Sequence, residues 1–186
     1  MFFAADLPVW IGWENQIIEN TQAFVLLLGA FQAIWFQRES DNDWQWLWCV
    51  AAPIWLICFA RELSWGAVLY PPTSIGEHGP QFSSSTLWYK PFVYPTVSVV
   101  LLFVVVSIVK ARALVRSLIP SKYMPWTELI FVAVCALVST AAEGHMGLHT
   151  SFFAGDPQIL EESAELCAYI LLLAAQCRVR NFQNIS

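Results

Sequence analysis

A short segment late in the chain combines one carboxylate with two histidines. In the sequence AAEGHMGLH, Glu143 precedes His145 and His149. Histidines four residues apart share one face of a helix and can reach a single metal ion. Gly144 and Gly147 flank His145, however, and could end the helix before it. The segment therefore predicts either part of a metal site or a water-exposed loop that carries two histidines.

Three glutamates follow in the sequence LEESAEL. Glu161 and Glu165 share a helix face, and two carboxylates one turn apart repel unless a cation or a proton lies between them. Acidic residues also favour the first turn of a helix without any ligand, because they interact with its dipole. Glu165 lies about two turns in, where this explanation weakens. We expect Glu165 to be a metal ligand, and either Glu143 or Glu161 to be the catalytic base that takes a proton from metal-bound water.

An adjacent pair of opposite charges, Arg61 and Glu62, ends an apolar run in the sequence FARELSWG. Glu62 is a candidate metal ligand, and Arg61 could bind a phosphate or carboxylate of a substrate through two hydrogen bonds. Alternatively, Arg61 extends to the lipid head groups while Glu62 pairs with solvent or a neighbour. A further polar set, Glu14, Glu19, Asn20 and Gln22, lies at the start of an earlier apolar run, and its two amide side chains, Asn20 and Gln22, can form hydrogen bonds across helices.

The amino-acid composition indicates a membrane protein. Hydrophobic residues make up 58% of the 186 residues and charged residues only 12%, whereas soluble domains carry about 25% charged residues. The formal net charge of −5, with no basic stripe to meet phosphates, argues against nucleic acid as a partner. We expect an integral membrane protein whose main partner is the lipid bilayer.

The apolar runs predict the architecture. A membrane helix needs about 20 mostly apolar residues. We therefore expect a single all-α domain, a bundle of five transmembrane helices over residues 11–36, 44–65, 95–114, 126–143 and 157–177. Pro53 predicts a kink in the second span. The third span is the most apolar and should face lipid broadly, whereas Gly29, Ala30 and Ala33 in the first form a small-residue face for helix packing.

The distribution of basic residues predicts the orientation. Cytoplasmic loops carry an excess of Lys and Arg. With five spans, one side receives Arg38, Lys110, Arg112, Arg116, Lys122, Arg178 and Arg180, and the other receives Arg61 and Lys90. We expect the N-terminus outside and the C-terminus in the cytoplasm, in what would be the inner (plasma) membrane of a bacterium.

In this orientation the candidate site residues named above all lie at the outer face of the membrane. This placement suggests two classes of function. The first is a metal-dependent hydrolase of a lipid or lipid-linked substrate, in which Glu62, His145, His149 and Glu165 hold a divalent metal such as zinc. The alternative is a non-enzymatic assembly, transport-subunit or scaffold protein with a membrane protein partner, in which Arg61 pairs with a glutamate of another helix. A haem protein is less favoured, because His145 and His149 share one segment and cannot easily grip opposite faces of a haem.

Overall fold

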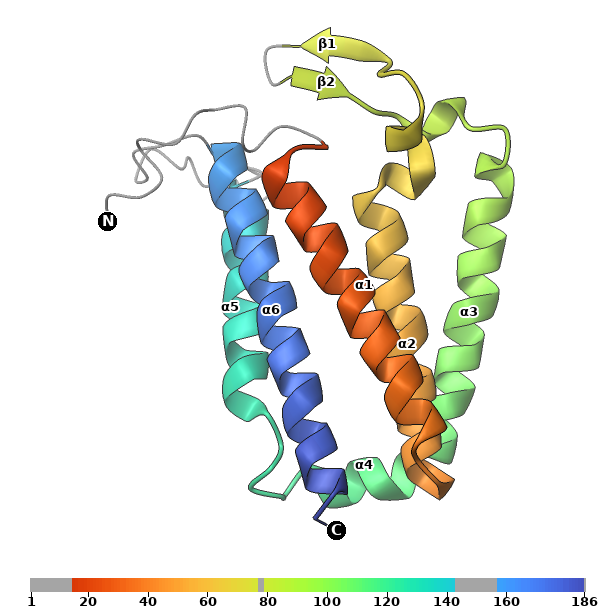
Figure 1. The fold of residues 1–186 in the computed structure, drawn as a ribbon, viewed down its shortest axis with the longest axis vertical. Helices are drawn as coiled ribbons and strands as arrows, with labels where there is room; N and C mark the ends of the chain where they lie inside the picture. Colours follow the sequence, from red (N-terminus) through yellow and green to blue (C-terminus); the bar gives the residue numbers. More distant parts are fainter. Residues whose placement is uncertain (1–14, 77–78, 143–156, 186) are drawn as a thin grey trace.

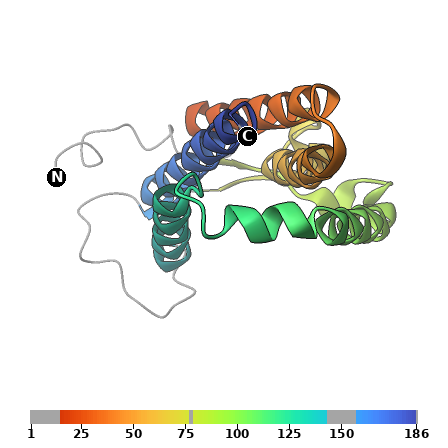
Figure 2. The same cartoon turned by 90° about the horizontal axis from the view of Figure 1, so that it is seen from below.

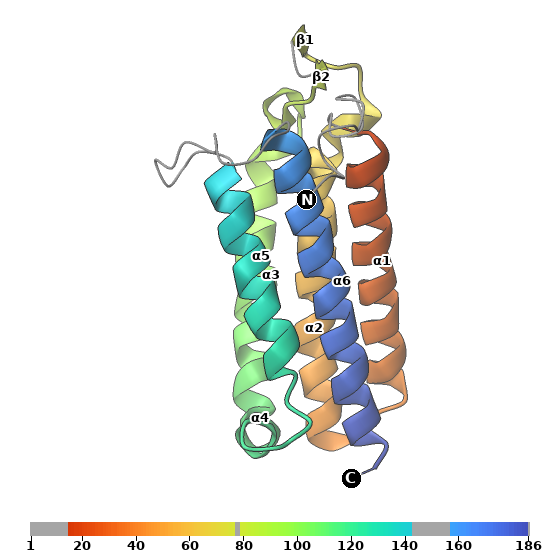
Figure 3. The same ribbon diagram turned by 90° about the vertical axis from the view of Figure 1, so that its left-hand side faces the viewer.

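The computed structural model describes residues 15–76, 79–142 and 157–185, and most of these residues are helical. Five long helices lie side by side (Figures 1 and 3): α1 (Ile17–Arg38), α2 (Asn42–Glu62), α3 (Lys90–Lys110), α5 (Trp126–Ala142) and α6 (Pro157–Gln183). The short helix α4 (Arg112–Leu118) lies across their lower end, between α3 and α5 (Figure 2). The all-α class predicted from the sequence is confirmed for these elements.

Three of the helices, α1, α2 and α3, are long and apolar enough to cross a membrane. Helix α5 is apolar but has 17 residues, and α6 has 27. The third predicted span is broadly exposed, as a lipid-facing helix would be: large apolar side chains of α3 such as Val99 and Leu102 are 68% and 64% exposed. Such a surface is costly in water and favourable in hydrocarbon.

The centre of the bundle is built on the small-residue face of α1, as the sequence predicts. Ala30 and Ala33 are buried, and the indole ring of Trp55 lies directly over Gly29. A Cβ atom on Gly29 would come within 2.5 Å of that ring. The Trp55 Nε1–H donates to Gln176 Oε1 (2.7 Å), and Gln176 Nε2 donates to the Gly29 carbonyl (3.1 Å). One tryptophan and one glutamine thus join α1, α2 and α6.

The second span ends earlier than the sequence analysis placed it. Helix α2 stops at Glu62, and a 3-10 segment, η2 (Ser64–Leu69), follows. The α-helix cannot continue because Ser64, Trp65 and Gly66 all have positive φ angles, which is outside the right-handed helical region. The Tyr89 hydroxyl donates to the Trp65 carbonyl (2.8 Å) and holds this turn. Pro53 lies within α2, and the helix continues through it.

The third span is shifted relative to its predicted bounds of 95–114. Helix α3 begins at Lys90, because Pro91 occupies a first-turn position where its missing N–H costs little. It ends at Lys110, and the chain turns at the fully buried Ala111 into α4. Residues 112–114 therefore belong to the crossing helix. The first span begins at Ile17, within the predicted 11–36, and residues 11–14 lie outside the described residues.

A small hairpin in the connection from α2 to α3 was not predicted. Strands β1 (Ser74–Gly76) and β2 (Gly79–Gln81) pair antiparallel above the upper end of the bundle (Figure 1). The last helix, α6, also runs on to Gln183, six residues beyond the predicted end at 177. Its extra turns are polar and bond to the connection between α1 and α2, a partnership that hydrophobicity alone does not reveal.

Candidate functional site

Two helices that are far apart in the sequence bring charged residues together at the upper end of the bundle. Arg61 and Glu62 lie in the last turn of α2, and Glu162, Glu165 and Tyr169 lie in the first half of α6. We call these five residues the α2–α6 cluster. The Tyr169 hydroxyl donates to Glu62 Oε1 (2.6 Å), and Arg61 Nη2 lies 3.9 Å from Glu165 Oε1. The cluster therefore contains one cation and three carboxyl groups.

The two neighbouring helices also contact this cluster. Gln22 of α1 is completely buried, and its Nε2 donates to the backbone oxygen (2.8 Å) and to a side-chain oxygen (2.9 Å) of Glu162. Ser139 of α5 donates to Glu165 Oε1 (3.1 Å). Each contact joins different helices, so the polar groups position α1, α2, α5 and α6 relative to one another. Buried polar groups require such partners, because an unpaired one costs about 1–3 kcal/mol.

Access to the cluster differs between its members. The side chain of Arg61 is 65% exposed, whereas that of Glu165 is 19% exposed. Glu62 is buried. Arg61 is thus the member that a molecule outside the bundle meets first, while the carboxyl groups lie deeper. At 3.9 Å its ion pair with Glu165 is long for a charge-assisted hydrogen bond, which leaves guanidinium N–H groups available to an anion.

Of the four predicted metal ligands, two lie within the described residues and two do not. Glu62 and Glu165 come together at one end of the bundle, but each accepts a hydrogen bond, from Tyr169 and Ser139 respectively. Within the described ranges, no three His, Cys, Asp or Glu side chains are grouped as a metal site requires. Glu143, His145 and His149 lie outside the described residues. The divalent-metal site therefore stays a prediction that the described geometry does not favour.

Two members of the site carry no charge and were missed in the sequence analysis. Tyr169 lies one helical turn after Glu165 and two after Glu162, so the helical repeat could have placed it on their face. Ser139 gave no usable signal, since a lone serine in an apolar helix commonly bonds its own backbone. Glu161, the other candidate base, lies in the second turn of α6.

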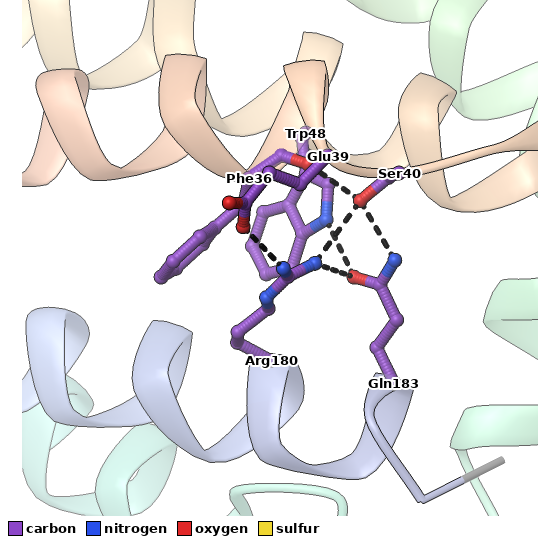
Figure 4. A network of polar contacts seen from close by, with 6 residues as sticks. All are labelled: Phe36, Glu39, Ser40, Trp48, Arg180 and Gln183. Carbon is purple, nitrogen blue, oxygen red and sulfur yellow. Dashed lines mark hydrogen bonds and ion pairs between the residues drawn. The ribbon is translucent and has the colours of Figure 1, made fainter.

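A second polar network closes the lower end of the bundle (Figure 4). Arg180 of α6 lies at its centre and donates to Glu39 Oε2 (2.6 Å), Ser40 Oγ (3.3 Å) and Gln183 Oε1 (2.9 Å). Its guanidinium carbon lies 4.9 Å from the centroid of the Phe36 ring. The network fastens the end of α6 to the connection between α1 and α2. Nearby, Arg178 forms an ion pair with Glu128 and fastens α6 to α5.

Between the two polar ends lies an apolar cavity of about 340 Å³. Its walls come from α2 and α6, with Leu26 of α1 behind them. Val115 and Leu118 of α4, with Met124 and Pro125 before α5, close its lower end. Tyr169 lines the cavity and also donates its hydroxyl to Glu62, so the cavity leads directly to the α2–α6 cluster.

Comparison of the chain with protein-family models, with curated proteins and with solved structures finds no match.

Proposed function

We propose that this protein is an integral membrane protein of five spans whose outer end binds the head group of a lipid or lipid-linked molecule. The observation that carries the proposal is the α2–α6 cluster, in which an exposed arginine stands beside one buried and two half-buried carboxyl groups at one end of an apolar bundle. Ionisable groups within membrane helices are costly, usually face the bundle interior and often mark function. The apolar cavity below the cluster supports an amphiphile rather than a water-soluble ligand.

The charges of the cluster favour a zwitterionic head group. Arg61 supplies the exposed cation, and a phosphate would complement it. Three carboxyl groups lie around that cation, and each of them that is ionised would repel a purely anionic head group at short range. A phosphate with a nearby ammonium group, as in phosphoethanolamine, places one charge against Arg61 and the other against Glu62, Glu162 or Glu165.

With five spans, the positive-inside bias favours an N-terminus outside and a C-terminus in the cytoplasm. Helices α5 and α6 pack against each other and α6 packs against α1, which supports both as spans beside α1, α2 and α3. We expect a fluorescent protein fused after Ser186 to fluoresce in a bacterial host and an alkaline phosphatase fused there to be inactive. The opposite pattern would reverse the orientation and place the cluster in the cytoplasm.

Head-group binding is tested by replacing Arg61. We expect Arg61→Ala to weaken binding of fluorescent phosphatidylethanolamine to the purified full chain by about 10–100-fold, which corresponds to the loss of roughly 1.4–2.8 kcal/mol. Arg38→Ala is the matched control, because Arg38 is an exposed arginine at the end of α1 opposite the cluster. Equal affinity of the two variants would contradict a head-group site at Arg61.

Hydrolysis of the bound lipid by a divalent metal remains the catalytic extension of this proposal. It requires His145 and His149 to join Glu62 and Glu165, with Glu143 or Glu161 as the base. Elemental analysis of purified protein, with His145→Ala beside it, tests the extension. About one metal per chain that the variant loses would support it, and a metal content no higher than that of the buffer would remove it.

The second candidate is the non-enzymatic scaffold, and a specific observation favours it. The contacts Tyr169–Glu62, Ser139–Glu165, Gln22–Glu162 and Arg61–Glu165 all join different helices. A network of this kind stabilises the bundle whether or not a ligand binds. The scaffold candidate requires a stable membrane protein partner in mild detergent and no lipid affinity that depends on Arg61.

A further inference from the structure

The shape and lining of the apolar cavity define what it can hold. Along α2 it extends from Leu47 to Cys58, which at a rise of 1.5 Å per residue is roughly 16 Å. The hydrocarbon core of a bilayer is about 30 Å thick, so the cavity extends along roughly half of that thickness, across the middle of α2. Val115 and Leu118 close its lower end.

The polar groups in the lining are already satisfied by the protein. Apart from the weakly polar thiol of Cys58, they belong to Trp48, Trp55, Tyr169 and Gln176. The indole N–H groups donate to glutamine side chains, the tyrosine hydroxyl donates to Glu62, and the Gln176 amide bonds both to Trp55 and to a backbone carbonyl. Ordered water needs two to four polar partners in a cavity. This lining does not supply them, and it suits a hydrocarbon chain.

The cavity also has a polarity along its axis. Its lower end is closed by apolar side chains of α4 and of the residues before α5, whereas its upper end reaches Tyr169 and the α2–α6 cluster. Neither α3 nor α5 contributes any of the described lining residues. These two helices stand at opposite ends of α4 (Figure 2).

We infer that the cavity binds one acyl chain of a phospholipid whose head group lies at Arg61, with the methyl end of the chain against Val115 and Leu118. The inference rests on the proposed function and adds the chain to the head group. The proposed ligand is a diacyl phospholipid with a zwitterionic head group. One of its acyl chains lies inside the protein and the other lies in the bilayer. Charge complementarity at the upper end and the closed apolar lower end fix the direction of the chain.

The test uses a phosphatidylethanolamine that carries a photoreactive diazirine at the methyl end of one acyl chain. The full chain is placed in phosphatidylglycerol nanodiscs with a trace of this probe and irradiated. We expect cross-links in residues 115–125, read by mass spectrometry of peptides. Cross-links confined to outward-facing residues of α3, or to no specific segment, would overturn the inference.

A cavity-filling variant provides a second, independent readout. Ala51→Phe places an aromatic ring in the cavity, and we expect it to reduce cross-linking at 115–125 at least tenfold. Val105→Phe makes a comparable increase in size on an exposed position of α3 and should leave the cross-links unchanged. If Ala51→Phe does not fold, the cross-links of the unmodified chain still decide the question.

The outcomes separate the two proposals. If Arg61→Ala loses lipid binding while Ala51→Phe keeps it, the head-group site stands and the acyl-chain inference is overturned. If Arg61→Ala keeps binding while Ala51→Phe loses it, the chain is held by the cavity and the head-group proposal fails.

Discussion

Replacement of Gly29 by alanine will lower the free energy of unfolding by about 1–3 kcal/mol, the usual cost of overpacking a core. The new methyl group would stand 2.5 Å from the Trp55 ring, so the indole has to move. Its N–H would then leave Gln176, and Gln176 would lose its contact with the Gly29 carbonyl. Reversible unfolding in mixed detergent micelles, followed by tryptophan fluorescence, measures the change.

Trp55→Leu provides the control for this prediction. The smaller side chain makes room for a methyl group, so adding Gly29→Ala to Trp55→Leu should cost much less than adding it to the unmodified protein. A double-mutant cycle isolates this coupling. Equal costs in the two backgrounds would mean that the indole does not lie over Gly29.

Replacement of Arg180 by alanine will lower the free energy of unfolding by about 2–3 kcal/mol. Hydrogen bonds to charged groups contribute about 1.5–3 kcal/mol, and Arg180 is only 14% exposed with three acceptors around it. The Glu39 partner is 46% exposed, so solvent screens that pair and we assign most of the loss to Ser40 and Gln183.

Arg116→Ala is the matched control for Arg180→Ala, since Arg116 lies exposed on α4 near the same end of the bundle. Thermal stability of both purified variants, measured by the fraction that remains monodisperse after heating, gives the comparison. A variant of Arg180 as stable as that of Arg116 would show that the network in Figure 4 contributes nothing to the fold.

The sequence predicted the features that depend on composition along one helix. Apolar length identified α1, α2 and α3, and small residues identified the face of α1 that receives Trp55. Chain direction then placed Arg61 and Glu62 at the same end as Glu165, because antiparallel helices alternate their ends. These inferences need no knowledge of how far each helix is rotated about its axis.

The side-chain contacts between helices could not be predicted, because each depends on the rotation of two helices about their axes and on their register. Tyr169 meets Glu62 across 107 residues, and Gln22 meets Glu162 across 140. Hydropathy also missed the last turns of α6, whose polar side chains are stabilised by Ser40 and Glu39 rather than by lipid. The turn at Ala111 into α4 was also missed, because the predicted span was extended past Lys110 and Arg112 to the apolar residue Leu114.

Side chains that are made early in synthesis have hydrogen-bond partners on α6, the last helix. Gln22 receives its partner Glu162 only after about 140 further residues are made, which takes roughly 7–30 s at 5–20 residues per second. Trp55 waits in the same way for Gln176. Until α6 is made, these two side chains therefore lack the partners that they have in the complete bundle. A chain that stops before α6 leaves such polar groups unpaired, at a cost of about 1–3 kcal/mol for each one that is buried.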